Sequence, residues 1–140
     1  RPAMPPAPLH VVFVAPFFMP ATLRFVDAAA ALDGVRLSLV SQDPFEKLPP
    51  ALAARLAGHW RVDDALDARQ IVAAARELAR RFGPVQRLVA SLEQLQVPLA
   101  VAAEQLGLPG LAPAAAQRCR DKRLMKDAFA QQGVPCARYA

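Results

Sequence analysis

The sequence predicts an α/β fold in which a doubly wound, Rossmann-like parallel sheet is covered by helices on both faces. Short β-branched, apolar runs alternate along the 140 residues with segments whose apolar residues recur at helical spacing. The first apolar run, residues 11–15, is apolar on both faces, which is typical of a strand in the middle of a parallel sheet. Because crossovers between parallel strands are right-handed, helices are expected on both sides of the sheet.

Four strands are predicted, over residues 11–15, 35–40, 60–62 and 85–90. In the second, apolar residues alternate with Arg36 and Ser38, so one face is expected to be less buried and the strand to lie nearer an edge. The first strand is expected at the centre of the sheet, flanked in parallel by the second and the fourth.

The helices are predicted from apolar periodicity and from their stop residues. The first spans residues 21–32, with Phe25, Ala29 and Leu32 on its inner face and Gly34 after it. A short helix over residues 50–57 precedes Gly58. The third helix is predicted over residues 67–82; Asp67 caps it, and its inner face carries Ile71, Ala75, Leu78 and Phe82. The fourth is predicted over residues 98–106 and ends at Gly107; its inner face carries Leu99, Ala102, Ala103 and Leu106.

The alternation stops after residue 107. Pro113 begins a short predicted helix, Asp121 caps another over residues 122–132, and Gly133 ends it. Residues 134–139 begin a strand that has no partner in the sequence, so the chain is expected to be truncated. Three parts are predicted: a flexible Pro-rich leader over residues 1–8, an α/β domain over 9–112, and over 113–140 a helical linker with the first strand of a missing domain.

Charge and composition exclude several classes of protein. The net charge is +5, but basic residues are dispersed except between Arg118 and Lys126, and no aromatics are interleaved with that cluster, so no nucleic-acid partner is expected. Two cysteines suit neither a disulfide framework nor a zinc site and indicate reduced thiols in a cytoplasmic protein. The apolar run over residues 11–21 contains Pro16 and Pro20 and is too short to span a membrane; a cleaved signal peptide is the alternative to a buried strand.

Ligands of open α/β sheets gather at the carboxyl ends of the strands. The loop after the first strand, Pro16, Phe17, Phe18 and Met19, lacks the glycines of a dinucleotide fold and the paired acids of a signal receiver domain. Glu93 and Gln94 follow the fourth strand, where they could bind a polar substrate, although Glu93 could equally cap or pair within its loop. His10 and His59 have no neighbours that suggest metal or triad chemistry, and the sequence shows neither a full catalytic set nor a metal site.

The order of motifs between Leu106 and Pro135 resembles the entry to an ATP-grasp fold. Leu106-Gly107-Leu108-Pro109-Gly110-Leu111 is followed after about ten residues by Asp121-Lys122, and Gly133-Val134-Pro135 follows the helix. The chain as a whole resembles the N-terminal, pre-ATP-grasp domain of carboxylate–amine or carboxylate–thiol ligases such as biotin carboxylase and the D-alanine ligases. Members of this superfamily use ATP and magnesium to activate a carboxylate as an acyl phosphate, which an amine or similar nucleophile then attacks.

The resemblance implies that Lys122 reaches the nucleotide phosphates. The alternative is that Lys122 is only one of the charges on a solvated helix face. It implies that residues 16–19 and Glu93-Gln94 face a small carboxylate substrate. The remaining ATP and magnesium ligands would lie beyond residue 140, so the chain alone is expected to be inactive and to bind no cofactor tightly. A homodimer is left open. The rival hypothesis is a non-enzymatic, doubly wound ligand-binding or interaction module.

Overall fold

The computed structural model describes residues 3–137, and its elements alternate in the predicted order as far as the fourth helix. Residues 3–8 are irregular and exposed, while Arg1 and Pro2 of the predicted leader lie outside the described residues. The strands are β1 (Leu9–Val14), β2 (Val35–Ser41), β3 (Gly58–Arg61) and β4 (Arg87–Val89). The helices are α1 (Pro20–Ala30), α2 (Pro50–Ala53), α3 (Ala68–Phe82), α4 (Gln96–Gln105), α5 (Pro113–Arg120) and α6 (Lys122–Gln131), and 3₁₀ turns occupy Phe45–Lys47 and Glu93–Leu95.

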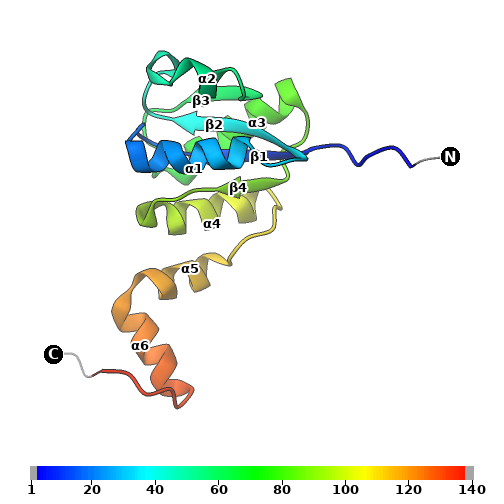
Figure 1. Cartoon of the computed structure of the whole chain (residues 1–140). Coiled ribbons are helices and arrows are strands. Elements are labelled where there is room, and N and C mark those ends of the chain that lie inside the picture. Colours follow the sequence, from blue (N-terminus) through cyan, green and yellow to red (C-terminus); the bar gives the residue numbers. More distant parts are fainter. Residues whose placement is uncertain (1–2, 138–140) are drawn as a thin grey trace.

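The four strands form one parallel sheet in the order β3-β2-β1-β4 (Figure 1). β1 pairs with β2 from Leu9 opposite Val35 to Val14 opposite Val40, and with β4 from Val11 opposite Arg87 to Phe13 opposite Val89. The predicted central position of the first strand, flanked in parallel by the second and fourth, is therefore confirmed.

The expectation that the second strand lies nearer an edge is wrong, because β3 covers its outer side. Ser38, one of the polar residues on which that expectation rested, is fully buried. Its hydroxyl lies 2.8 Å from Nε2 of His10, whose Nδ1 lies 2.8 Å from the carbonyl oxygen of Gly83. A buried polar group is inexpensive when it is hydrogen-bonded, so Ser38 marks an internal contact rather than an exposed face.

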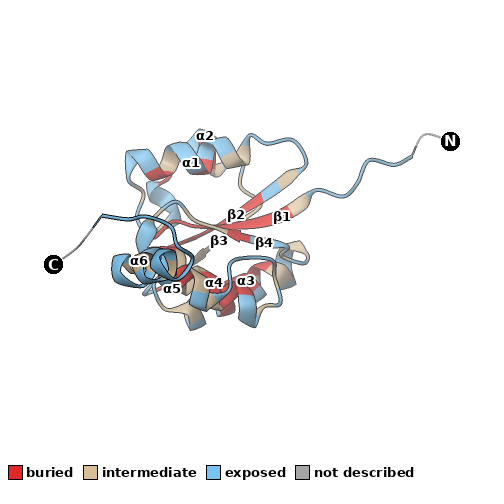
Figure 2. Ribbon diagram, turned by 90° about the horizontal axis from the view of Figure 1, so that it is seen from below, coloured by how far each residue is buried: buried red, intermediate tan, exposed pale blue. Residues whose placement is uncertain are grey.

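Helices cover both faces of the sheet, with α1 and α2 on one side and α3 and α4 on the other (Figure 2). Alternate residues of β1 supply the two cores, because successive side chains of a strand point to opposite faces. Val11 and Phe13, with Ala15 just after the strand, pack toward α1 and α2, and Val12 and Val14 pack toward α3 and α4. The doubly wound fold class is confirmed.

The inner face predicted for the first helix is wrong. Phe25 is 60% exposed and Leu32, which lies after the end of α1, is 59% exposed, whereas Thr22 and Val26 are buried. Alanine occupies so many positions in this segment that apolar residues lie on every side of the helix. Periodicity alone therefore cannot identify the buried face.

The faces predicted for the next two long helices are confirmed. Asp67 caps α3 by accepting a hydrogen bond from the backbone amide of Arg69 at 2.9 Å. The buried stripe of α3 includes Ile71, Ala75 and Leu78, and Ala102 and Ala103 of α4 are buried in the same core. These two helices close the face of the sheet opposite α1.

The last two helices extend the chain away from the sheet (Figure 1). α5 packs against α4, α6 packs against α5, and no residue of α6 is buried. Asp121 caps α6 as predicted, accepting from the backbone amides of Arg123 and Leu124. The strand predicted over residues 134–139 is not formed by residues 134–137, and Arg138 and Tyr139 lie outside the described residues.

Gly58 at the start of β3 lies directly under the end of α3. A Cβ atom at this position would approach the Phe82 ring to 2.4 Å and Cδ2 of Leu78 to 3.1 Å. Gly58→Ala should therefore lower the free energy of unfolding by about 1–3 kcal/mol, the usual cost of overpacking a core. Urea denaturation measures the change. Gly110→Ala is the control, since its Cβ would meet Ala103 at an ordinary 3.4 Å; equal losses in the two variants would contradict the predicted clash.

Candidate functional site

The carboxyl ends of the strands carry most of the candidate residues. Because β2 and β3 lie on one side of β1 and β4 lies on the other, the strand order reverses between β1 and β4. In doubly wound sheets this switch point is where ligands bind. The two loops from which substrate contacts were predicted, residues 16–19 and 91–94, follow these two strands.

The loop after β1 presents apolar side chains to solvent. Pro16 is buried and Phe18 is half-buried, but Phe17 is 49% exposed and Met19 is 45% exposed. Met19 immediately precedes α1, which begins at Pro20. Large apolar side chains exposed at a ligand edge suit contact with an apolar group of a substrate or of another domain.

Asp43 fixes the conformation of this loop. Its Oδ2 accepts from the backbone amide of Phe18 at 2.8 Å, and its Oδ1 accepts from Nζ of Lys47 at 3.2 Å. The carbonyl of Pro16 in turn accepts from the amides of Gln42 and Asp43 at 2.8 and 3.1 Å. The backbone hydrogen bond from Phe18, reinforced by Lys47, lowers the pKa of the Asp43 carboxyl, so this anchor is ionised at neutral pH.

Gln42 and Asp43 are not among the residues predicted from the sequence to contact a substrate. A signal was available, because an amide and a carboxylate follow a buried strand here as Glu93 and Gln94 follow β4. Gln42 also accepts, through its side-chain oxygen, from the backbone amide of Ala65 at 3.1 Å. The loops after β1, β2 and β3 are thus joined by hydrogen bonds into one surface.

His59 lies in β3. Its Nε2 is 2.6 Å from the hydroxyl of Ser41, and that hydroxyl donates to the carbonyl of Asp43 at 2.7 Å. Nε2 must therefore carry the proton and donate it to Ser41. Burial lowers the pKa of His59, Glu46 opposes this effect and Arg61 adds to it.

The lowered pKa of His59 makes stability depend on pH. Between pH 6.5, the ordinary histidine value, and the lower folded pKa, the unfolded chain binds more protons than the folded chain. The contribution of His59 to the stability of the fold is therefore fully present above pH 6.5 and is lost as the pH falls through the folded pKa. The thermal midpoint of the protein should decrease from pH 7.5 to pH 5, and less steeply for His59→Gln. Identical pH profiles for the two proteins would contradict this assignment.

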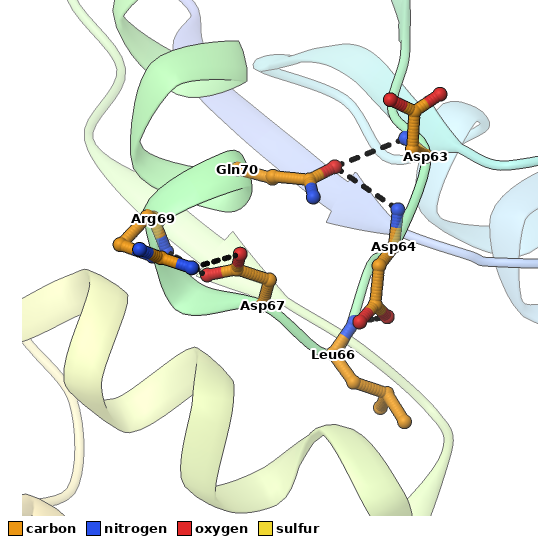
Figure 3. A network of polar contacts seen from close by, with 6 residues as sticks. All are labelled: Asp63, Asp64, Leu66, Asp67, Arg69 and Gln70. Carbon is orange, nitrogen blue, oxygen red and sulfur yellow. Dashed lines mark hydrogen bonds and ion pairs between the residues drawn. The ribbon is translucent and has the colours of Figure 1, made fainter.

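The connection from β3 to α3 is ordered by a polar network at the same edge of the sheet (Figure 3). Oε1 of Gln70 accepts from the amides of Asp63 and Asp64 at 3.0 Å each, and Asp64 accepts from the amide of Leu66. The pKa of Asp67 is lowered mainly by the hydrogen bond from the Arg69 guanidinium, and next by the hydrogen bond from the Arg69 backbone amide. The network serves to terminate β3 and begin α3.

The loop after β4 borders a pocket of about 460 Å³ between α4 and residues 109–111. Glu93 lines it, and Oε1 of Glu93 lies 3.4 Å from Nη1 of Arg120 at the end of α5. The structure therefore joins the predicted substrate loop to the helical segment that follows the sheet. Gln94 is exposed and is not among the residues that line this pocket, and neither are residues 16–19.

Lys122 lies two residues beyond Arg120, at the first position of α6. Its side chain is exposed, and no hydrogen bond or ion pair joins its ammonium to another described residue. The start of α6 lies on the same side of the molecule as the carboxyl ends of the strands, and Arg120 just before it contacts Glu93 (Figure 1). Two of the predicted site residues, Glu93 and Lys122, are brought into one region in this way.

Residues 3–137 contain no group of three histidine, cysteine or acidic side chains that could hold a metal ion. Within the same range, none of the helices has the length and apolar character needed to cross a bilayer. The cysteines, Cys119 and Cys136, are both unpaired and exposed.

No protein-family model and no curated protein matches the chain. Solved structures do match. L-amino acid ligase from Bacillus licheniformis superposes with a TM-score of 0.71 at 19% identity, over 94% of this chain and 32% of that one. Phosphoribosylglycinamide synthetase from Anaerococcus prevotii superposes with a TM-score of 0.67 at 18% identity, over 93% and 30%. The chain spans about a third of the length of these two enzymes, and it has the fold of the part of each that it covers.

Proposed function

We propose that the chain is the N-terminal, substrate-side domain of a longer ATP-dependent ligase. In the proposed reaction a carboxylate oxygen attacks the γ-phosphorus of ATP and ADP leaves. The nitrogen of an amine, or a similar nucleophile, then attacks the acyl phosphate carbon, phosphate leaves, and the nucleophile loses its proton. ATP and a small carboxylate are the partners in this proposal, and the two exposed thiols support a cytoplasmic location.

The observation that carries the proposal is the position of Lys122 within a fold shared with two ligases. Asp121 caps α6 by accepting from the amides of Arg123 and Leu124, so Lys122 stands in the first turn with its side chain exposed. An ammonium on a long flexible stem suits a polyphosphate. We assign to Lys122 a contact with the nucleotide phosphates. In the same proposal, residues 9–112 form the α/β domain and residues 113–140 connect it to an ATP-grasp domain.

The other candidate residues receive roles in the same proposal. Phe17 and Met19 are exposed and face an apolar part of the substrate, while Pro16 and Phe18 hold the loop through their backbone contacts with the segment after β2. Glu93 supplies a carboxylate at the loop after β4, with Gln94 beside it. No step is assigned to a metal held by this chain, because its described residues bring no ligand set together; magnesium and the remaining ATP contacts are assigned to the ATP-grasp domain.

Product analysis of the full-length protein tests the proposal. With magnesium, ATP, a carboxylate and an amine, the protein should release ADP and inorganic phosphate in amounts equal to the amide formed. Omission of either the acid or the amine should abolish amide formation. AMP and pyrophosphate would instead indicate an acyl adenylate, and no consumption of ATP with any acid would favour the non-enzymatic binding module.

A further inference from the structure

The pocket beside Glu93 has the size and lining of a small-molecule site. Its volume of about 460 Å³ lies within the range of roughly 300–1,000 Å³ that such sites occupy. It lies between the end of β4, the helix α4 and residues 109–111. Its interior is mainly apolar, from the side chains of Leu88, Leu95, Leu99, Ala100, Ala103 and Leu111. The pocket therefore suits a ligand with an apolar body.

Polar groups also line or border this pocket. Ser91, Glu93 and Gln96 contribute to the lining, and Arg120 pairs with Glu93. This ion pair is long, at 3.4 Å, and its side chains are 75% exposed for Glu93 and 37% exposed for Arg120. Exposed ion pairs of this kind contribute little to stability, so a ligand that offers better partners can separate the two charges.

We propose that this pocket binds an apolar α-amino acid. The apolar side chain enters the pocket, the ammonium group pairs with the Glu93 carboxylate, and the carboxylate pairs with the Arg120 guanidinium. When Glu93 and Arg120 separate, a zwitterion offers a positive group to Glu93 and a negative group to Arg120. Neither side chain is then left unpaired. The planar guanidinium also matches a carboxylate through two parallel hydrogen bonds. A ligand with a single charge would leave one member of the pair without a partner.

The inference deepens the proposed function by naming a substrate class, and it rests on that function for the fate of the bound amino acid. Binding itself needs no ATP, since the lining residues and Arg120 all belong to this chain. The two hypotheses can therefore fail separately. Lys122→Met should leave amino-acid binding unchanged even where it abolishes turnover.

Calorimetric titration of the 140-residue chain with L-phenylalanine, in the absence of ATP, tests the proposal. Phenethylamine, which lacks the carboxylate, and N-acetyl-L-phenylalanine, which lacks the charged amine, should each bind at least about tenfold more weakly. L-Alanine, which leaves the pocket unfilled, should also bind at least about tenfold more weakly. Absence of L-phenylalanine binding, or equal affinity for phenethylamine, would overturn the proposal.

Charge variants separate recognition from a purely structural role of the ion pair. Glu93→Gln and Arg120→Gln should each weaken L-phenylalanine binding at least about tenfold, whereas Arg120→Gln should leave the affinity for phenethylamine within about twofold. A merely structural ion pair would change both affinities together. Glu104→Gln at the end of α4 and Arg118→Gln on α5 are the matched controls, because both side chains are exposed and neither lines the pocket; losses in these controls equal to those at Glu93 and Arg120 would refute the site.

Discussion

Replacing Leu78 with alanine should lower the free energy of unfolding by about 2–5 kcal/mol, the usual cost of removing a buried leucine side chain. Leu78 is fully buried in α3, in the core that joins this helix to β1 and β2 and to α4. The substitution removes apolar contacts and leaves a cavity that the surrounding side chains fill only in part. Since domains are stable by roughly 5–15 kcal/mol, a loss of this size would be plain in the midpoint of urea denaturation.

Leu32→Ala is the matched control for this prediction. Leu32 has the same side chain and was expected from the sequence to face the core, but it is 59% exposed. Its substitution should change stability by no more than about 0.5 kcal/mol. A loss at Leu32 equal to the loss at Leu78 would show that the first helix buries the face predicted from periodicity rather than the face seen in the structure.

The parts of the fold that the sequence predicts correctly are those with a local physical cause. Residues 11–15 are apolar on both faces, and a strand of that kind is stable only when helices cover both sides of its sheet. Asp67 and Asp121 each stand directly before a helix, where a carboxylate can accept from free backbone amides. Both caps form as predicted.

The failures have non-local causes. Ser38 suggests a less buried face, and only the approach of His10, 28 residues away, makes its burial inexpensive. The alanine-rich first helix gives no unique apolar stripe, so its orientation depends on the sheet against which it packs. In each case a contact between distant segments overrides the local pattern.

The candidate site shows the same limit. Glu93 is predicted from the sequence because it follows a strand, but its contact with Arg120, 27 residues further along the chain, depends on how α5 packs against α4. Asp43 follows a strand in the same way and was missed, although it fixes the loop after β1. Strand ends therefore predict which residues can take part in a site, and tertiary packing decides which of them meet.

If the full-length protein is the proposed ligase, replacing Lys122 with methionine in it should lower kcat/KM for ATP by about thirty- to several-thousand-fold. This range corresponds to about 2–5 kcal/mol for the loss of one partner of a charge-assisted contact in a closed site, with 1.4 kcal/mol for each factor of ten. Lys122 is exposed at the first turn of α6, where a cation is slightly unfavourable for the helix dipole, so its charge does not serve the stability of the helix. The thermal midpoint of the variant should therefore stay unchanged or rise slightly, while steady-state kinetics show a higher KM for ATP and a lower kcat.

Lys126→Met supplies the control one helical turn further along α6. Nζ of Lys126 donates to the carbonyl of Ala137 at 3.0 Å, so this ammonium already has a partner within the chain. Its substitution should change kcat/KM by less than about fivefold, as expected for a surface charge. Equal losses at the two lysines would indicate general attraction of ATP by the basic segment, and an unchanged KM and kcat for Lys122→Met would refute the phosphate contact itself. A large loss at Lys122 alone would identify the start of α6 as the point where this domain contacts the nucleotide.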